Sequence, residues 1–424
     1  MVARVMEGER LRYRSINSCI ATGILLDGCH IITVEGLRES GELCEVQASM
    51  VRNFGSQCGF CTPGFVMSLM NMFEHKSQMT EQNVKNYLTG NLCRCTGYAP
   101  ILKAALDVDV HRHRRLAERF PMEELTRELR EEIRRPVLVE WAGREFYAPV
   151  SLEQAAEYKA RHSCVRIFSG ATDLGVQVNK GKDHGERLMS LHLIEELYGT
   201  RAENSRMRIG ARVTLDRLQS EMQERVPVFA NFLNIFASPQ IKSAATLVGN
   251  LANGSPIADT IPFLLTMDAE MEMASKRGVR VVEVSRFFKG YKDLDLAGDE
   301  FISFISFALP SIETSKMALY KVSQRRDLDI SCVNSGFYIQ LEPGERRIGK
   351  ARVAFGGVGP TPIRVPRAED WLQGKTPDAA TLGKARELIG ESIAPVSDVR
   401  GSEEFRRLMC QRLFDRFTAE HLTA

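Results

Sequence analysis

The sequence predicts a multidomain α+β protein, and three observations support this prediction. The chain has 424 residues, which is enough for two to four domains of ordinary size. Most of its ten cysteines fall within the first 95 residues, which is typical of a small metal-binding module. Beyond residue 137, segments with strand periodicity alternate with segments of helical periodicity. We therefore expect a cysteine-rich module followed by a larger globular part.

Composition and charge exclude several functional classes. Lys and Arg number 56 and Asp and Glu 54, so the net charge of +2 provides no nucleic-acid-binding surface. No apolar run approaches the ~20 residues of a membrane span, and the charged start MVARVMEGERLRYR contains no apolar signal region. A cytoplasmic location is expected, in which cysteines remain reduced.

Short strands and helices are expected around the cysteines. Strand-like residues occupy 12–16 and 30–33. Thr62 is a natural N-cap followed by proline at the first helical position, so a helix is expected from there. A second helix is expected over Glu81–Leu88, and a third from about Pro100.

Residues 111–135 are rich in Arg and Glu and are split by a proline. Leu125, Leu129 and Ile133 form an apolar stripe at helical spacing, which indicates a charged helical linker or docking strap. A solvated helix face is the alternative.

The remainder alternates strands and helices. A buried strand at Val165–Phe168 is followed by a turn or helix to Asn179, and another helix is expected near Pro227–Phe236. Further strands are expected over 333–341 and 351–355, and further helices over 379–391 and 403–421.

Four cysteines form two pairs, Cys58-x-x-Cys61 and Cys93-x-Cys95. Four thiolates suit either tetrahedral zinc or a [2Fe–2S] cluster. The one-residue gap of the second pair is awkward for a zinc knuckle. Nearby glycines bring backbone N–H groups close to the sulfurs, which favours iron–sulfur. Zinc and free core cysteines remain as alternatives.

Two loops of small residues are candidates for holding a dinucleotide. Ser169–Gly175 follows the strand at Val165–Phe168, and 245–250 continues into 252–259. Backbone N–H groups in such loops can cradle a pyrophosphate, although a plain strand-to-helix turn would look the same. The charged segment YKVSQRRDLDIS, at Tyr320–Ser331, is a third candidate, with a solvated loop as its alternative.

The segments GSQCGFCTPGF and LTGNLCRCTGYAPIL resemble the helical [2Fe–2S] domain of molybdenum hydroxylases. More narrowly, the chain is similar to the small iron–sulfur and FAD subunit of the bacterial xanthine dehydrogenase family. This resemblance implies five regions along the chain. They are a truncated plant-type ferredoxin domain of β-grasp fold (1–48), a helical [2Fe–2S]-binding bundle (49–110), a charged linker (111–144), a vanillyl-alcohol-oxidase-type FAD-binding domain (145–312) and an α+β flavoprotein C-terminal domain (313–424).

The resemblance also implies which residues bind the cofactors. The metal ligands would be Cys58, Cys61, Cys93 and Cys95. The FAD-binding residues would be Phe168, Ser169, Gly170, Ala171, Thr172, Asp173, Leu174, Gly175, Phe236, Ala245, Thr246, Gly249, Asn250, Asp259, Phe304 and Lys321. Arg326 and Asp327 would lie near the flavin ring and NAD. Val248 replaces a family glycine, and its Cβ is expected to crowd the phosphate.

The N-terminus departs from the family pattern. Cys19 matches the fourth ligand of a second cluster, but the Cys-x4-Cys-x2-Cys loop that supplies the other three is absent from this sequence. We therefore expect one [2Fe–2S] cluster, with no metal on Cys19.

The resemblance implies an electron-transferring subunit. Electrons from hypoxanthine or xanthine hydroxylation would come from a large subunit that binds the molybdenum cofactor. They would pass through the cluster and FAD to NAD+, in a heterotetramer with two copies of each subunit. Alternatives are the equivalent subunit for an aldehyde, carbon monoxide or an N-heterocycle, or a zinc-stabilised scaffold without redox activity. Neither a nucleic-acid partner nor a membrane is expected.

Overall fold

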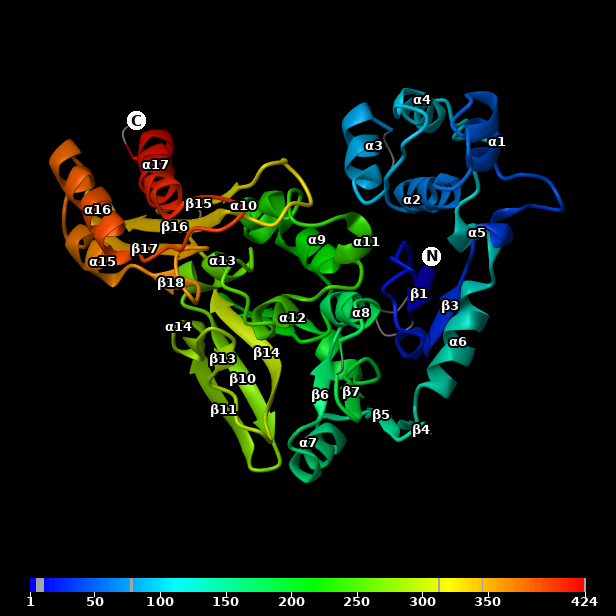
Figure 1. Ribbon diagram of the computed structural model, residues 1–424, viewed down its shortest axis with the longest axis horizontal. Helices are drawn as coiled ribbons and strands as arrows, with labels where there is room; N and C mark the ends of the chain where they lie inside the picture. The colour runs from blue at the N-terminus through cyan, green and yellow to red at the C-terminus, as the bar shows by residue number, and fades with distance from the viewer. Residues whose placement is uncertain (5–10, 77–78, 183, 312, 345, 423–424) are drawn as a thin grey trace.

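The computed structural model describes the chain from residue 1 to 422, except residues 5–10, 77–78, 183, 312 and 345 (Figure 1). A central α+β domain lies between the cysteine-rich N-terminal module and a C-terminal α+β domain (Figure 1), and it is called the flavin domain below because the sequence predicts FAD binding there. The predicted multidomain α+β fold is confirmed. None of the described helices combines the length and the apolar character that crossing a bilayer requires.

The N-terminal module combines a small sheet with a group of helices. Its sheet has the order β2-β1-β3 and is antiparallel throughout. The strands are β1 (Val2–Arg4), β2 (Tyr13–Arg14) and β3 (Cys29–Ile31). The helices are α1 (Glu45–Arg52), α2 (Thr62–His75), α3 (Glu81–Leu88) and α4 (Ala99–Leu106), with short 3-10 turns at Gly23–Leu26 and Glu35–Leu37.

Three predicted helices of this module are confirmed, with one correction at the start of α2. The N-cap is Cys61, and Thr62 is already the first helical residue. The Thr62 hydroxyl instead donates to the Ser56 hydroxyl at 2.8 Å. The loop that carries the cysteine pair therefore runs directly into α2.

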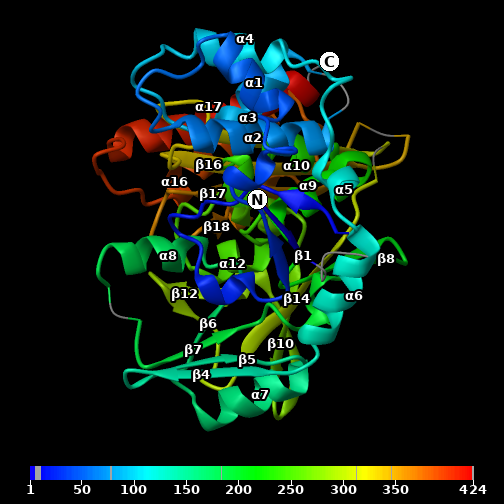
Figure 2. The same cartoon turned by 90° about the vertical axis from the view of Figure 1, so that its right-hand side faces the viewer.

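The charged segment after α4 packs on the N-terminal module. It forms α5 (Leu116–Arg119) and α6 (Met122–Glu132), and α6 runs alongside β3 (Figure 2). Leu125 and Leu129 pack against the N-terminal core, and Ile133 is buried in it. The apolar stripe thus faces the module, which favours the strap interpretation over a fully solvated helix.

The flavin domain contains two sheets. The first has the order β4-β5-β7-β6, in which β5, β7 and β6 are parallel, and it comprises β4 (Val137–Trp141), β5 (Arg144–Ala148), β6 (Arg166–Phe168) and β7 (Arg187–Ser190). Its helices are α7 (Leu152–Arg161) and α8 (Thr172–Asn179). The expected buried strand is β6, but β6 is an edge strand whose Arg166 is exposed, so it is buried only at Phe168.

The second sheet of the flavin domain is antiparallel, with the order β11-β10-β14-β9-β8. Its strands are β8 (Thr200–Glu203), β9 (Arg206–Gly210), β10 (Glu270–Ser275), β11 (Gly278–Glu283) and β14 (Phe301–Ala308). The helices are α9 (Leu215–Arg225), α10 (Pro227–Phe232), α11 (Pro239–Lys242), α12 (Leu247–Ala252), α13 (Ile261–Thr266) and α14 (Val284–Phe287), with a 3-10 turn at Glu195–Tyr198 and the small pair β12 (Phe288–Gly290) and β13 (Asp293–Leu294).

The C-terminal domain packs helices on a four-stranded sheet of order β15-β16-β17-β18. The strands are β15 (Ser315–Val322), β16 (Val333–Leu341), β17 (Ile348–Gly356) and β18 (Ile363–Arg364), and the helices are α15 (Pro366–Leu372), α16 (Ala379–Ser392) and α17 (Glu403–His421). The rings of Phe337 and Phe417 stack at 5.2 Å and join β16 to α17. The predicted strands and helices of this region are confirmed.

One hydrophobic core extends across the boundary between the N-terminal module and the first flavin sheet. It combines Phe65 and Leu69 of α2 with Phe146, Phe168 and Leu174. The rings of Phe146 and Phe168 lie 6.0 Å apart. Separating these two parts of the chain would expose apolar surface from both, so they are expected to unfold together.

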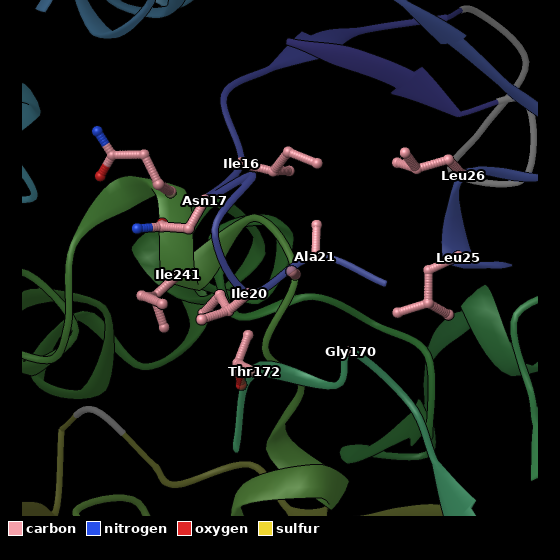
Figure 3. A pocket seen from close by; sticks show the side chains of 11 residues that line it. Ile16, Asn17, Ile20, Ala21, Leu25, Leu26, Gly170, Thr172 and Ile241 are labelled. Atoms are coloured by element: carbon pink, nitrogen blue, oxygen red, sulfur yellow. The ribbon is translucent and has the colours of Figure 1, made fainter. Parts of the chain in front are cut away.

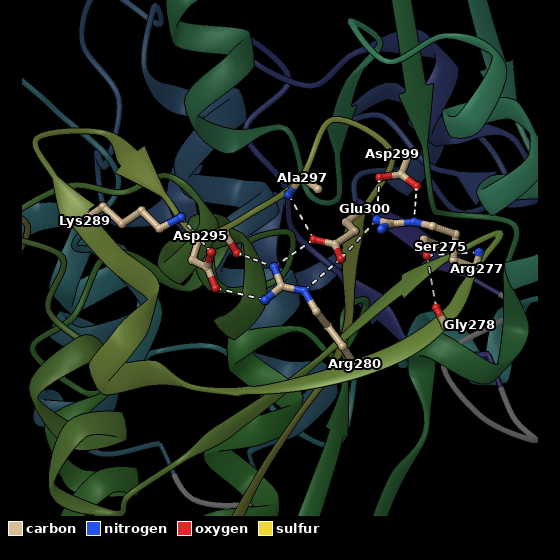
Figure 4. Close-up of polar contacts among 9 residues, drawn as sticks. All are labelled: Ser275, Arg277, Gly278, Arg280, Lys289, Asp295, Ala297, Asp299 and Glu300. Carbon is tan, nitrogen blue, oxygen red and sulfur yellow. Dashed lines mark hydrogen bonds and ion pairs between the residues drawn. The ribbon is translucent and has the colours of Figure 1, made fainter.

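An ion-pair network fixes the β10–β11 hairpin to the segment before β14 (Figure 4). Arg280 on β11 donates two hydrogen bonds of 2.8 Å to Glu300 and one of 2.9 Å to Asp295. Lys289 also pairs with Asp295, at 2.7 Å. Glu300 is only 4% exposed, and its hydrogen bonds to Arg280 hold the pKa of this carboxyl below its usual value.

Arg280→Met should destabilise the protein by about 1–3 kcal/mol at pH 7, because it removes both hydrogen bonds of Arg280 to the buried Glu300 carboxylate and leaves only the more distant Arg277, at 3.6 Å, beside its charge. The lowered pKa means that the native state favours the charged form of Glu300. Its stabilising effect is therefore present at neutral pH and is lost as the pH falls below the usual carboxyl range. Urea unfolding at several pH values should show the largest difference between the two proteins at pH 7. A difference that does not shrink toward pH 3 would contradict this account.

Candidate functional site

The four paired cysteines meet at one end of the helical group. Cys58 and Cys61 lie in the loop before α2, and Cys93 and Cys95 lie between α3 and α4. The sulfur atoms of Cys95 and Cys58 are 3.2 Å apart. The thiols of Cys61 and Cys93 are also in hydrogen-bonding contact. Each sulfur pair thus combines one cysteine from each motif.

This pairing fits the donor set of a [2Fe–2S] cluster, in which four thiolates serve two irons. Each sulfur pair can supply two ligands to one iron, whereas a structural zinc needs four ligands around a single point. The two-and-two arrangement of these sulfurs suits the binuclear cluster.

The surroundings of the sulfurs favour thiolates at two positions. The Thr96 hydroxyl, with backbone N–H groups of Thr96 and Cys95, lowers the pKa of Cys93 to about 7. The N–H of Phe60 lowers the pKa of Cys58. Burial has the opposite effect on Cys61 and raises its pKa to about 11. Thiolates are the form that binds metal, and the same N–H groups can donate to cluster sulfur.

Two glycines shape the cysteine loops. Gly59 has φ +81° and Gly97 has φ +69°, a region that residues with a Cβ rarely adopt. Each lies within two residues of one of the four paired cysteines. The Tyr98 hydroxyl accepts a hydrogen bond from the Cys93 N–H at 3.1 Å, which ties the second loop to the start of α4.

The first small-residue loop joins β6 to α8 and contributes to the N-terminal core. Phe168 and Leu174 are buried there, Ala171 has φ +54°, and Asp173 lies in the first turn of α8. Among the described residues, no group accepts a hydrogen bond from the N–H of Gly170 or Ala171. Unpartnered N–H groups at the start of a helix fit an anionic pyrophosphate.

The two small-residue loops touch each other directly. A Cβ added to Gly170 would overlap the carbonyl oxygen of Ala244, so the two backbones are in contact. The Thr246 hydroxyl lies 3.3 Å from that of Ser169, and Thr246 also accepts from the Gly249 N–H at 3.0 Å. The predicted dinucleotide loops are therefore one structural unit.

The N-terminal segment forms the other wall of a pocket beside this unit (Figure 3). Ile16, Ile20 and Leu25 face Gly170 and Thr172 across it. A Cβ on Gly175 would overlap the Ile20 carbonyl oxygen, so the segment lies directly on α8. Cys19 is exposed, and its carbonyl accepts a 2.6 Å hydrogen bond from the Asn179 amide.

A buried group around Asp259 joins the second loop to the C-terminal domain. Lys321 pairs with Asp259 at 2.8 Å, with both side chains less than a tenth exposed. Asn334 donates to Asp259 at 2.8 Å, and the Ser331 hydroxyl also donates to it. Each acceptor oxygen of the carboxylate thus has at least one donor within the protein.

The remaining predicted residues lie around this unit. The Ala245 carbonyl accepts from the Leu215 N–H at 2.8 Å, and the Asn250 side chain accepts from Thr260 at 2.6 Å. Phe236 and Phe304 belong to the large core of the flavin domain. The Arg208 guanidinium lies over the ring of Phe304, 3.3 Å from its centroid.

Arg326 and Asp327 lie in the loop between β15 and β16. Burial lowers the pKa of Lys242 to about 8. Asp327 is close enough to this lysine for its negative charge to oppose part of that shift. Lys242 is bound to the Leu233 carbonyl at 2.8 Å and to Gln219 at 2.9 Å. The loop therefore approaches α11 of the flavin domain.

The Val248 side chain is 5% exposed and packs in the flavin-domain core. The expected crowding of the phosphate by its Cβ stays a prediction.

Sequence reasoning missed the buried Arg212. Its guanidinium donates to the Ser169 hydroxyl at 3.1 Å and to the Tyr198 hydroxyl at 3.2 Å. Asn334 was missed as well, whereas Ser331 ends the third candidate segment. The signal for Arg212 is an arginine among apolar residues at the end of a strand, which indicates a buried cation with specific acceptors.

Three known domain families match the chain. The "[2Fe-2S] binding domain" matches residues 33–106, the "FAD binding domain in molybdopterin dehydrogenase" matches 142–310, and the "CO dehydrogenase flavoprotein C-terminal domain" matches 318–421.

Curated relatives and solved structures agree with these matches. Xanthine dehydrogenase of Emericella nidulans is 27% identical over 88% of this chain and 31% of its own length, and xanthine dehydrogenase 1 of Arabidopsis thaliana is 28% identical over 95% and 35%. The chain thus spans about a third of these relatives. A chain of quinoline 2-oxidoreductase from Pseudomonas putida 86 has a TM-score of 0.60 and 26% identity, covering 66% of this chain and 98% of its own. A chain of carbon monoxide dehydrogenase from Hydrogenophaga pseudoflava shares the fold, with a TM-score of 0.60 and 24% identity over 64% of this chain and 94% of its own.

The fold and the two sites define an iron–sulfur flavoprotein, whose cofactors are FAD and a [2Fe–2S] cluster. Its matched domains are similar, in chain order, to a [2Fe-2S] binding domain, the FAD-binding domain of molybdopterin dehydrogenase and the C-terminal domain of the CO dehydrogenase flavoprotein.

Cys93→Ser should abolish the visible absorption of the [2Fe–2S] cluster, because a hydroxyl is a poor substitute for a thiolate ligand of iron. Absorption spectra and iron analysis of the purified protein would measure this. Cys410→Ser is the matched control, since Cys410 is buried in the C-terminal core and should leave the spectrum unchanged. A full cluster spectrum in Cys93→Ser would refute the ligand assignment.

Gly170→Ala should weaken FAD binding about tenfold or more, because the added methyl group overlaps the Ala244 carbonyl and overpacking costs about 1–3 kcal/mol. Titration of flavin-free protein with FAD would measure the affinity. Gly383→Ala is the control, since nothing lies within 4 Å of a Cβ there. Iron content should stay unchanged in both variants, and loss of iron together with FAD would indicate misfolding instead.

Proposed function

We propose that the chain is the electron-transferring subunit of a xanthine dehydrogenase. Electrons from hypoxanthine or xanthine hydroxylation on a molybdenum-cofactor subunit would pass through its [2Fe–2S] cluster and FAD to NAD+. The observation that carries this proposal is the joining of a surface cluster site and a flavin site in one chain. Cys58 and Cys95 are exposed, whereas the flavin loops lie behind the N-terminal segment.

The surface around the cluster site supports a protein partner. Phe60, between the first two cysteines, is 97% exposed, and Leu92, beside Cys93, is 64% exposed. Phe54 is exposed nearby in sequence. Exposed large apolar residues at a redox site are typical of an interface, because they are desolvated when a partner docks. The partner in this proposal is the molybdenum-cofactor subunit, in a heterotetramer with two copies of each.

The chain's own residues would position the two cofactors. Cys58, Cys61, Cys93 and Cys95 would hold the cluster, with hydroxyl and N–H donors stabilising negative sulfur. The loop at 168–175 would bind the FAD pyrophosphate, and the loop at 245–259 the rest of the dinucleotide. FAD supplies the exchange between single electrons and a hydride.

Arg326 and Asp327 would adjust charge and nicotinamide access at the flavin. The network of Asp259, Lys321 and Asn334 would hold the second small-residue loop on the C-terminal domain. The loop that carries Arg326 and Asp327 belongs to the same domain. Lys321 would thus act on the flavin site through its ion pair with Asp259 and would not contact the reacting atoms.

A related subunit for another substrate is the alternative. The likeness to a quinoline 2-oxidoreductase chain favours it, because substrate choice would lie on the partner subunit. A cytoplasmic location and about two irons per chain belong to the main proposal, with Cys19 carrying no metal.

With the molybdenum subunit present, Cys93→Ser should abolish xanthine-dependent reduction of NAD+ but keep NADH oxidation by an artificial dye. The first activity needs the cluster, whereas the second needs only the flavin site. Both rates would be measured by absorbance on the purified complex, with Cys410→Ser as the control. Replacing xanthine with quinoline, an aldehyde or carbon monoxide tests the related alternative. Xanthine-dependent NAD+ reduction that survives in Cys93→Ser would contradict the relay.

A further inference from the structure

A glutamine from the flavin domain inserts into the helical cluster module. Gln240 belongs to α11, and its Nε2 donates a 2.7 Å hydrogen bond to the Ser68 hydroxyl of α2. The same hydroxyl accepts a 2.7 Å hydrogen bond from the Asn91 amide. Gln240 is 6% exposed and Ser68 is 2% exposed, so this bridge across the domain boundary is shielded from water.

Gly90 makes room for this glutamine. A Cβ at Gly90 would overlap the Gln240 Oε1 and lie 2.8 Å from the Cβ of Ser238. Gly90 is not among the positive-φ residues, so close approach and not backbone conformation requires glycine there. The end of the α3 segment is thus pressed against the start of α11.

Both ends of the bridge lead to a cofactor site. Asn91 lies two residues before Cys93. On the other side, Gln240 lines the same pocket as Ala244, whose carbonyl touches Gly170 of the first flavin loop. Two hydrogen bonds and short stretches of chain therefore connect a cluster ligand to the flavin loop.

We propose that Gln240 is a positioning residue that fixes the separation between the cluster loop and the flavin loop through Ser68 and Asn91. This inference rests on the proposed function, because the separation matters when an electron passes from the reduced cluster to FAD. That step oxidises the cluster and reduces the flavin by one electron each, and no bond forms or breaks. Electron tunnelling slows steeply with distance, so a module that moves away would lower the rate.

The bridge is expected to limit local opening of the boundary. Buried hydrogen bonds are weak individually but are costly to leave unmade, because opening exposes or strands their partners. Arg14 on β2 also pairs with Asp216 on α9, which is a second contact across the same boundary. Removing Gln240 should therefore loosen the boundary without separating the shared core.

The test uses the full chain loaded with both cofactors, in three variants. Gln240→Ala removes the bridge from the flavin side, and Gly90→Ala displaces it from the cluster side. Ser243→Ala is the matched control, because Ser243, the C-cap of α11, is 3% exposed and its hydroxyl donates, among the described residues, only to the Pro239 carbonyl of α11 at 2.8 Å. Iron and flavin contents should match the wild type in all three.

Two measurements report on the boundary itself. Hydrogen exchange of peptides covering 66–72, 88–92 and 236–246 should be about fivefold to tenfold faster in both bridge variants, as expected from losing modest hydrogen bonds that limit local opening. Pulsed EPR on half-reduced protein should show a longer or broader distance between cluster and flavin. Ser243→Ala should change neither quantity.

Wild-type exchange and wild-type cluster–flavin distance in both bridge variants would overturn the role of Gln240. If Gln240→Ala loses both cofactors through misfolding, the exchange rates and the cluster–flavin distance of Gly90→Ala alone test the role of Gln240. A wild-type chain whose reduced cluster never reduces its flavin would overturn the proposed function. Hydrogen exchange does not depend on electron transfer, so in that case it would still show whether the bridge limits opening of the domain boundary.

Discussion

The hydrophobic core shared by the helical cluster module and the first flavin sheet is the constraint on which the rest of the structure depends. Phe65 and Leu69 contribute from one side, and Phe146 and Phe168 contribute from the other. Because apolar burial has no preferred direction, this core keeps the module and the sheet close together but does not fix the distance between their cofactor loops. Directional hydrogen bonds, such as that from Gln240 to Ser68, can fix this distance. A redox relay needs both, since distance controls its rate.

The flavin site is held by contacts between segments far apart in sequence. Gly170 touches Ala244, and Asp259 binds Asn334 from the C-terminal domain. Arg212 is fully buried beneath the first loop, and among the described residues its guanidinium donates to hydroxyl groups and not to a carboxylate. Hydroxyl partners leave the guanidinium charge unneutralised, and an anionic phosphate nearby would benefit from it. The positive end of α8 adds to the same field.

Local signals predicted much of the helical structure. The spacing of apolar residues and the end signals of α2, α3, α16 and α17 were sufficient to predict these helices, although the N-cap of α2 is Cys61 and not the predicted Thr62. The exposed edge position of β6 and the interior side chain of Val248 were not predictable, because both depend on neighbours supplied by distant segments. The cysteine spacing indicated four ligands, but not which sulfurs pair. Arg212 and Asn334 act through partners 43 and 75 residues away, which no local pattern encodes.

The pairing of cysteines links metal binding to folding of the whole N-terminal module. Cys58 pairs with Cys95, and Cys61 contacts Cys93, so each iron would join the start of α2 to the loop before α4. Binding that requires deprotonated thiols in a preformed arrangement stabilises that arrangement. Asn91 lies in the same cysteine loop and reaches Gln240 through Ser68. Cluster binding would therefore also order the residues that meet the flavin domain, so the module becomes rigid at its boundary when it becomes able to carry an electron.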